Sequence, residues 1–354
     1  MFALRSQHNN IDFLRALAVL SVFAHHAQHV FASSIPFFGE YGGQFGPQLF
    51  FLISGYLITA SCRTYNLKQY VTHRFFRIFP AYWFYFIGIG VLTNVLTSAR
   101  VLSNPSGLLL NLGLLQQLFP TDLIDYDVLH VTWTLTVEVL WYATLPILLF
   151  FFKGISTLML VVVILLSNGL SFIANLGGLD FVYQAVISQN VAFRYLFVSN
   201  HFLVQLQFFI LGAYVFERQA YFSKFNAVGM VTLGLFIFLL KPFYFVFNPM
   251  LVTGLGLMCF LIAGVASRSI ANTVIVFLSE ISYSFYLCHF PIILYLNSKY
   301  ALMGYWGMML ALAATIVVST ISYLLIEKPG MRLGKRIGDR FRTTSIGGVI
   351  ANPL

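Results

Sequence analysis

The first apolar run, residues 11–31, contains the side chains best suited to chemistry, an arginine and several histidines. Arg15 and His26 are eleven positions apart. On an α-helix, eleven steps of about 100° return to almost the same face, roughly 16 Å further along. An imidazole can take a proton from a hydroxyl group and return it to a leaving group. Because charged and imidazole groups are costly inside a bilayer, we predict a functional role for this pair.

Two further histidines lie beside His26. His25 is about 100° around the helix and His29 is about one turn on, so the Arg15 face selects His26 as the candidate base and leaves His25 in a supporting position. Structural packing of the imidazoles and a proton relay are the alternatives to catalysis. The cluster has no carboxylate at metal-ligand spacing, so we expect no metal site. Asp12, one turn before Arg15, is placed to hold its guanidinium group.

A second candidate site follows the uncharged run 46–58, whose glycines and Ser54 favour close approach of another helix. Arg74 and Arg77 are three residues apart and share a helix face near the cytoplasmic surface. The ordinary excess of basic residues on that side explains many such pairs. Paired guanidinium groups also clamp phosphates, so we predict that Arg74 and Arg77 bind a phosphate-bearing ligand, with Arg15 deeper in the membrane.

Three polar groups of different runs share one predicted depth. Glu138 lies about five residues from the outer end of its run, and His26 and His289 lie about fifteen residues from the inner ends of theirs. At about 1.5 Å per residue in a core about 30 Å thick, all three reach a level about 22 Å from the cytoplasmic face. We predict that Glu138 orients or charge-balances His26, with Tyr283 and His289 in support. A packed aromatic face with one satisfied histidine is the alternative for the last two.

The elements that position these residues are predicted to be membrane helices. Hydrophobic residues make up 59% of the chain and charged residues only 9%, whereas soluble domains average about 25% charged residues. Length and polar breaks predict an all-α, polytopic membrane protein of about ten transmembrane helices. The predicted spans are 11–31, 46–62, 78–98, 134–152, 156–175, 201–217, 226–241, 247–266, 274–297 and 301–326.

The basic residues predict the orientation of these helices. With the N-terminus inside, cytoplasmic loops hold fifteen Lys and Arg residues and outer loops hold four, which favours an N-in, C-in arrangement. This bias also accounts for the net charge of +9, and we exclude nucleic-acid binding because no basic soluble module is present. We expect a transmembrane domain over 1–330 and a basic cytoplasmic tail over 331–354. Segment 105–119 is expected to be re-entrant or interfacial.

Six segments, taken together and in order, resemble the membrane acyltransferase-3 family over nearly the whole chain. They are IDFLRALAVLSVFAHHA, GPQLFFLISGYLI, RFFRIFP, TWTLTVEVLWY, ISYSFYLCHFP and IEKP. The positions that match the family's motifs are Arg15, His26, Arg74, Arg77, Glu138 and His289. Some members carry a C-terminal esterase-like domain outside the cytoplasm, and we expect none in this chain.

The resemblance implies a multi-pass protein of the bacterial inner membrane that transfers an acyl group, usually acetyl, from cytoplasmic acyl-CoA to a carbohydrate hydroxyl. Acetyl-CoA is then the expected acyl donor, and membrane lipids are expected to surround the protein. The acceptors left open are O-antigen, exopolysaccharide, peptidoglycan, a lipid-linked sugar and a small hydroxylated molecule. His26 is expected to act as general base or to carry a covalent acyl group. The alternative from another class is a proton-coupled transporter or flippase of a glycan precursor.

Overall fold

Helices are the regular elements of the described chain. The computed structural model describes residues 2–119, 126–178, 200–239, 249–267 and 272–341. In order, the elements are α1 (Phe2–Phe31), α2 (Phe38–Thr64), α3 (Leu67–Leu92), α4 (Ser98–Ser103), α5 (Pro105–Leu112), η1 (Gln116–Leu118), α7 (Trp133–Phe152), α8 (Thr157–Asn175), α11 (Phe202–Glu217), α12 (Gln219–Phe222), α13 (Ala227–Leu239), α14 (Pro249–Ala266), α15 (Thr273–Tyr300), α16 (Gly304–Ser322), the π-helical turn η3 (Tyr323–Glu327) and α17 (Lys328–Asp339). A helix therefore lies at each of the predicted runs.

Several of these helices have the length and composition of membrane spans. Within the described residues, five are long and apolar enough to cross a bilayer, namely α2, α3, α7, α15 and the rod from α16 to α17. Four shorter apolar helices lie in α8, α11, α13 and α14. The chain is thus built as a multi-pass membrane protein. Helix length and composition do not set direction, so the ten-span count and the N-in, C-in orientation stay predictions.

Helix α3 begins well before the predicted span. Asn66 and Gln69 form a capping box, in which each side chain accepts a hydrogen bond from the other residue's backbone N–H, and this starts the helix at Leu67. Arg74 and Arg77 therefore lie inside a rigid helix. The predicted interfacial segment 105–119 consists of short helices held to α3, where the Tyr82 hydroxyl donates to the Asn111 carbonyl at 2.8 Å.

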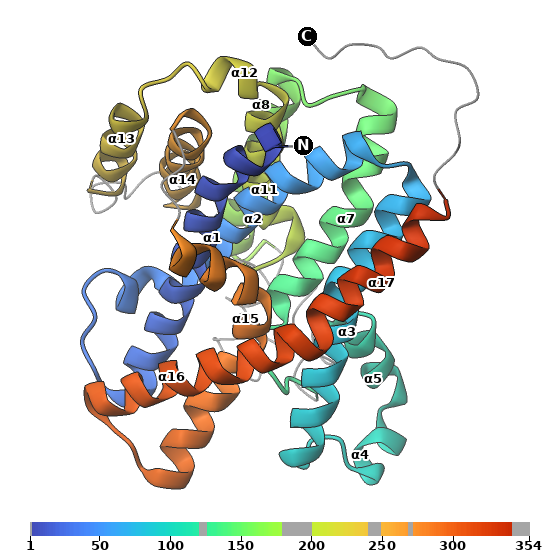
Figure 1. Cartoon of the computed structure of the whole chain (residues 1–354), viewed down its shortest axis with the longest axis vertical. Helices are drawn as coiled ribbons and strands as arrows, with labels where there is room; N and C mark the ends of the chain where they lie inside the picture. Colours follow the sequence, from blue (N-terminus) through green and yellow to red (C-terminus); the bar gives the residue numbers. More distant parts are fainter. Residues whose placement is uncertain (1, 120–125, 179–199, 240–248, 268–271, 342–354) are drawn as a thin grey trace.

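Helix α17 occupies the first part of the predicted tail. Figure 1 shows α16 and α17 in line, with α17 beside α3. Gly334 and Gly338 permit this approach, because a Cβ atom there would collide with Phe76 and His73 of α3. The tail predicted over 331–354 is therefore helical as far as Asp339, and residues 342–354 lie outside the described residues.

The buried apolar side chains form two cores that share a boundary. One core joins α2, α7, α11 and α14, and the other joins α3, α15 and α16. Helix α1 serves both, since Leu14 belongs to the first core and Phe23 to the second. Phe50 of α2 and Tyr142 of α7 pack against both cores. The seam between the cores is therefore lined by large side chains that neither core encloses completely.

Helices α1 and α15 run parallel along this seam. Asp12 accepts a hydrogen bond from Ser279, and Arg15 donates one to Ser282. Further along both helices, the rings of His26 and His289 lie 5.3 Å apart. Arg15 and His26 therefore face the same neighbouring helix, as their spacing predicts.

The contact between α2 and α11 tests how tightly the first core is packed. A Cβ atom at Gly212 would collide with the backbone of Leu52, whereas a Cβ atom at Gly88 of α3 meets nothing within 4 Å. We expect Gly212→Ala to lower the free energy of unfolding by about 1–3 kcal/mol, as overpacking does. The thermal midpoint of the detergent-purified protein measures this effect. Gly88→Ala is the control, and an equal fall in both variants would contradict the close approach.

Candidate functional site

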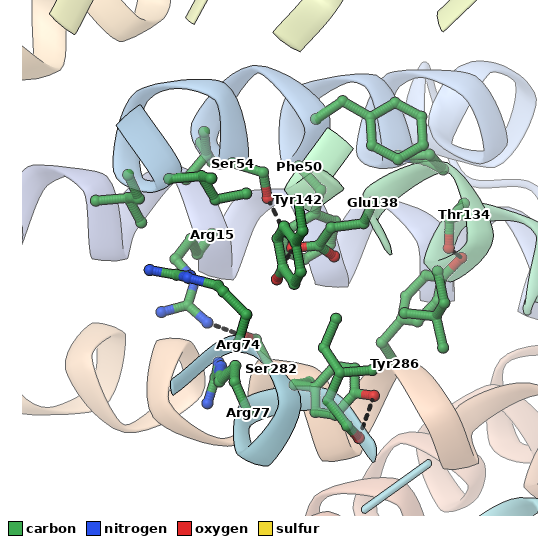
Figure 2. A pocket seen from close by; sticks show the side chains of 18 of the residues that line it. Arg15, Phe50, Ser54, Arg74, Arg77, Thr134, Glu138, Tyr142, Ser282 and Tyr286 are labelled. Atoms are coloured by element: carbon green, nitrogen blue, oxygen red, sulfur yellow. Dashed lines mark hydrogen bonds between the residues drawn. The ribbon is translucent and has the colours of Figure 1, made fainter. Parts of the chain in front are cut away.

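A cavity of about 380 Å³ lies at the seam between the two cores. Its wall is formed by side chains of α1, α2, α3, α7 and α15, with contributions from η3 and α17. Figure 2 shows Arg15, Arg74 and Arg77 gathered at one end, Glu138 near the middle and Tyr286 at the other end. The arginine residues predicted to bind one ligand are therefore brought together from α1 and α3.

Arg77 is neutralised by a carboxylate from η3. Its guanidinium group forms an ion pair with Glu327 at 2.5 Å, and the Glu327 side chain is completely buried. Ser284 donates a second hydrogen bond to Glu327 at 2.6 Å. The Tyr283 ring lies 5.7 Å from the Arg77 guanidinium, and its hydroxyl donates to the Ile78 carbonyl. Tyr283 thus lines the cavity and packs against the Arg77 guanidinium group.

Arg15 is held by α15. Its guanidinium group donates to the Ser282 hydroxyl at 3.1 Å. The Asp12 carboxylate accepts from Ser279 at 2.6 Å, and no ion pair joins it to Arg15 among the described residues. The predicted contact between Asp12 and the Arg15 guanidinium is therefore not made. Instead, each of the two side chains hydrogen-bonds to a serine of α15.

Among the described residues, Arg74, like Arg15, has no carboxylate partner. Its guanidinium lies over the rings of Tyr70 and Tyr142, at 5.9 and 5.5 Å from their centroids. Its Nε atom is buried and has no hydrogen-bond partner within the described chain, where no ion pair involves Arg74 either. A positive group in this state is suited to receive an anionic ligand.

Glu138 belongs to the cavity rather than to the histidines. Its carboxylate accepts hydrogen bonds from Ser54 at 3.1 Å and from the Tyr142 hydroxyl at 2.7 Å. Described contacts do not join it to His26, so the predicted orienting contact is not present. Equal depth along two helices leaves the direction of each side chain open, and α7 turns Glu138 towards α2 and the arginine end.

The histidines form a separate cluster beyond the cavity. The His26 ring lies 5.3 Å from that of His289, 5.4 Å from that of His25 and 4.2 Å from that of Phe290. His289 is fully buried, and its Nδ1 atom donates to the Tyr286 carbonyl at 2.7 Å. His25 instead donates to the Gly39 carbonyl, which holds the start of α2 against α1. These contacts place His25 and His289 as neighbours that fix the surroundings of His26.

Tyr286 separates the cavity from the histidine cluster. It lines the cavity, and its ring lies 5.6 Å from that of His289. Its hydroxyl donates to the Val131 carbonyl at 3.1 Å and shares a hydrogen bond of 2.8 Å with Thr134. The cavity therefore ends about one side chain short of the imidazoles.

An imidazole–carboxylate pair in the loop before α7 lies at the same end. The Nδ1 atom of His130 donates to Asp127 at 3.2 Å, and its backbone N–H donates to the other carboxylate oxygen at 3.0 Å. The hydrogen bond to Asp127 raises the pKa of His130 above its ordinary value, against the opposing effect of partial burial. The His130 ring lies 5.6 Å from Phe290, which also contacts His26.

Glu327 and the Asp127–His130 pair have no role in the sequence-based predictions. Glu327 is the acidic residue of the IEKP segment. The sequence therefore shows this residue, but it does not show that Arg77 is its partner. Asp127 and His130 are three residues apart, a spacing that indicates a local turn capped by a side chain. This spacing does not predict that the pair lies beside α15.

A family model described as an acyltransferase domain, Acyl_transf_3, matches residues 8–327. The chain belongs to the acyltransferase-3 family. The resemblance carried by the six segments is thereby confirmed, and the matched range includes the three arginine residues of the cavity, Glu138, Glu327 and the histidine cluster. No solved structure matches the chain.

Three relatives match parts of this acyltransferase-3 chain. The peptidoglycan O-acetyltransferase OatA of Listeria monocytogenes is 35% identical over 105 residues, which are 28% of this chain and 15% of that protein. Nodulation protein 10 of Rhizobium leguminosarum is 31% identical over 171 residues, 40% of this chain and 44% of that protein. An uncharacterized protein of Haemophilus influenzae is 31% identical over 140 residues, 33% and 55% respectively. The chain thus covers less than two thirds of each relative.

The two ion pairs of α3 and α2 differ in burial, which allows a direct test of Glu327. We expect Glu327→Gln to destabilise the protein by about 3–5 kcal/mol, because it leaves Arg77 charged and without its partner. The pair between Arg63 and Glu217 is partly exposed, so Glu217→Gln should cost only about 0–1 kcal/mol. Chemical unfolding of the purified variants measures both. Equal stability of the two variants would contradict a structural role for the buried pair.

Proposed function

We propose that the protein is an integral-membrane O-acyltransferase that moves an acyl group from cytoplasmic acyl-CoA to a hydroxyl group of a cell-surface carbohydrate or its lipid-linked precursor. Acetyl is the first candidate for the acyl group. The observation that carries this proposal is one cavity with an unpaired arginine at one end and His26 just past the other. A bacterial inner membrane is the proposed location, because the acyl donor and a surface glycan lie on opposite sides of it.

The arginine end is proposed to receive the phosphates of acyl-CoA. Arg74 and Arg15 have no described carboxylate partner, and Arg77, which is paired with Glu327, adds to the site from a fixed position. Glu138 limits this potential and holds Tyr142, which itself lies under Arg74. A volume of about 380 Å³ falls within the range of about 300–1,000 Å³ for small-molecule sites, and the apolar wall suits the thioester arm.

His26 is proposed to act as the general base. Its imidazole takes the proton of the acceptor hydroxyl as that oxygen attacks the thioester carbonyl. The carbon–sulfur bond breaks, and the CoA thiolate takes the proton back from the imidazolium. A covalent acyl group on His26 is the alternative: the imidazole nitrogen attacks the thioester carbonyl and the carbon–sulfur bond breaks to release the CoA thiolate. The acceptor oxygen then takes the acyl group as the carbon–nitrogen bond breaks, and its proton passes to the thiolate. In either order the acyl group must pass Tyr286, whose ring stands between the cavity and His289.

The relatives support a carbohydrate acceptor. OatA of Listeria monocytogenes is a peptidoglycan O-acetyltransferase by name, and it is 35% identical over 105 residues of this chain. We therefore propose peptidoglycan and related surface glycans as the first acceptors to examine, with O-antigen, exopolysaccharide and lipid-linked sugars as the others.

The role of His26 can be tested in membranes supplied with labelled acetyl-CoA and native glycan. His26→Ala should reduce acetyl transfer by about 10²–10⁴-fold, the range that general acid–base catalysis contributes. Mass spectrometry of the glycan measures the product, and the thermal midpoint shows whether the variant is folded. Undiminished acetylation by folded His26→Ala would overturn the role. Glycan flux without consumption of acyl-CoA would favour a transporter instead.

The donor end can be tested separately with Arg74. Arg74→Ala should raise the KM for acetyl-CoA about tenfold or more, because a charge-assisted contact to phosphate is lost. The KM for the glycan should stay unchanged. Arg336→Ala, which removes an exposed charge from α17, is the control for a general loss of positive potential. A rise in the acceptor KM alone would contradict the proposed phosphate site.

A further inference from the structure

The aromatic ring of Phe290 lies between two imidazoles that come from distant parts of the chain. The ring of His26 is 4.2 Å away with an interplanar angle of 31°, and the ring of His130 is 5.6 Å away at 80°. Phe290 is only partly buried, unlike its neighbour His289. One partly exposed aromatic side chain is therefore bordered by the proposed base and by a second polar group.

The second polar group is oriented by its own carboxylate. Asp127 receives the Nδ1 proton of His130, so the Nε2 atom is left for another partner, and no described residue hydrogen-bonds to it. The side chains of His130 and Asp127 are 44% and 33% exposed. This pair is thus accessible from outside, while its imidazole is held in one tautomer.

The loop that carries the pair is fixed on both sides. Leu129 is fully buried, and the carbonyl of Val131 accepts the hydrogen bond of Tyr286. His130 itself has a φ angle of +57°, in the left-handed region that a residue with a side chain rarely adopts. Such a conformation persists only where its surroundings hold it, and it aims the imidazole towards α15.

We propose that Phe290 and the Asp127–His130 pair form the acceptor subsite, which binds a neutral pyranose ring of the glycan. The apolar C–H face of the sugar packs on the part of the Phe290 ring that His26 leaves uncovered. The Nε2 atom of His130 hydrogen-bonds to one hydroxyl and leaves a neighbouring hydroxyl at His26. His130 is a binding and positioning residue in this arrangement, and His26 remains the base. The inference rests on the proposed function, because it assigns the acceptor of that same reaction.

A local structural explanation covers only part of this geometry. Capping of the turn requires one oxygen of Asp127, which accepts the backbone N–H of His130. The second oxygen engages the imidazole instead. The rings of His130 and His26 both contact the ring of Phe290, so the pair and the proposed base border the same aromatic side chain. Ring orientation, open Nε2 and proximity to His26 all point to an acceptor.

The full-length protein in lipid nanodiscs provides the test, with labelled acetyl-CoA as donor. The acceptor probes are tri-N-acetylchitotriose and soluble fragments of surface glycan from cells lacking the protein. Asp127→Asn keeps the oxygen that caps the turn and removes the charge. We expect Asp127→Asn, His130→Gln and Phe290→Leu each to raise the KM for glycan about tenfold, the loss of one good contact. The KM for acetyl-CoA should stay unchanged.

Matched variants separate binding from folding. Phe290→Tyr keeps the aromatic face and should keep the wild-type KM for glycan. His29→Gln changes an exposed histidine of α1 that lies outside this set, and it should have no effect. In Asp127→Asn, NMR titration should show a lower pKa for His130 than in the wild type, which confirms that the pair was broken in a folded protein.

The outcomes distinguish the subsite from the proposed function. An unchanged KM for glycan in all three variants, with His26→Ala inactive, would overturn the subsite alone. Acetyl-CoA cleavage by the wild type without acylation of either probe would overturn both the subsite and the carbohydrate acceptor of the proposed function. If the wild type used no acyl-CoA at all, the proposed function itself would fall.

Discussion

The buried ion pair between Arg77 and Glu327 is the interaction on which the cavity depends. Three guanidinium groups in an apolar bundle repel one another and are costly to desolvate. The π-helical turn at the end of α16 brings Glu327 inward, where it neutralises one of them and ties α16 to α3. Such turns often occur at functional sites. Glu327 pairs with Arg77 and Ser282 holds Arg15, so the guanidinium group left for a ligand is that of Arg74.

The position of the cavity follows from how the helices pack. Two apolar cores meet along α1, and large residues such as Phe50 and Tyr142 bridge them. A seam of this kind can hold polar side chains without opening either core to lipid. It also gives the site two ends. Tyr286, fixed by the Val131 carbonyl and Thr134, separates an arginine end from a histidine end, as a reaction with two chemically different substrates requires.

The short loop before α7 contributes more than a connection. Its buried residues and the hydrogen bond from Tyr286 of α15 hold it in place, while Asp127 and His130 remain accessible. Polar groups on a loop supported by rigid helices are well placed for recognition. The same hydrogen bond from Tyr286 that closes the cavity also fixes this loop, so the two ends of the site share one structural support.

The sequence alone determined the elements and the faces of single helices. Apolar run length predicted a helix at each position, and helical periodicity predicted that Arg15 and His26 would face one neighbour, because both follow from local geometry. The sequence predicted the depth of Glu138 in the membrane but not the direction of its side chain. The packing of α7 against α2 decided that direction, which is towards Ser54 and the arginine end. The tertiary structure likewise decided the partners of Arg77 and of Phe290. Glu327 lies 250 positions from Arg77, and no local pattern records which of two distant residues will meet when helices pack.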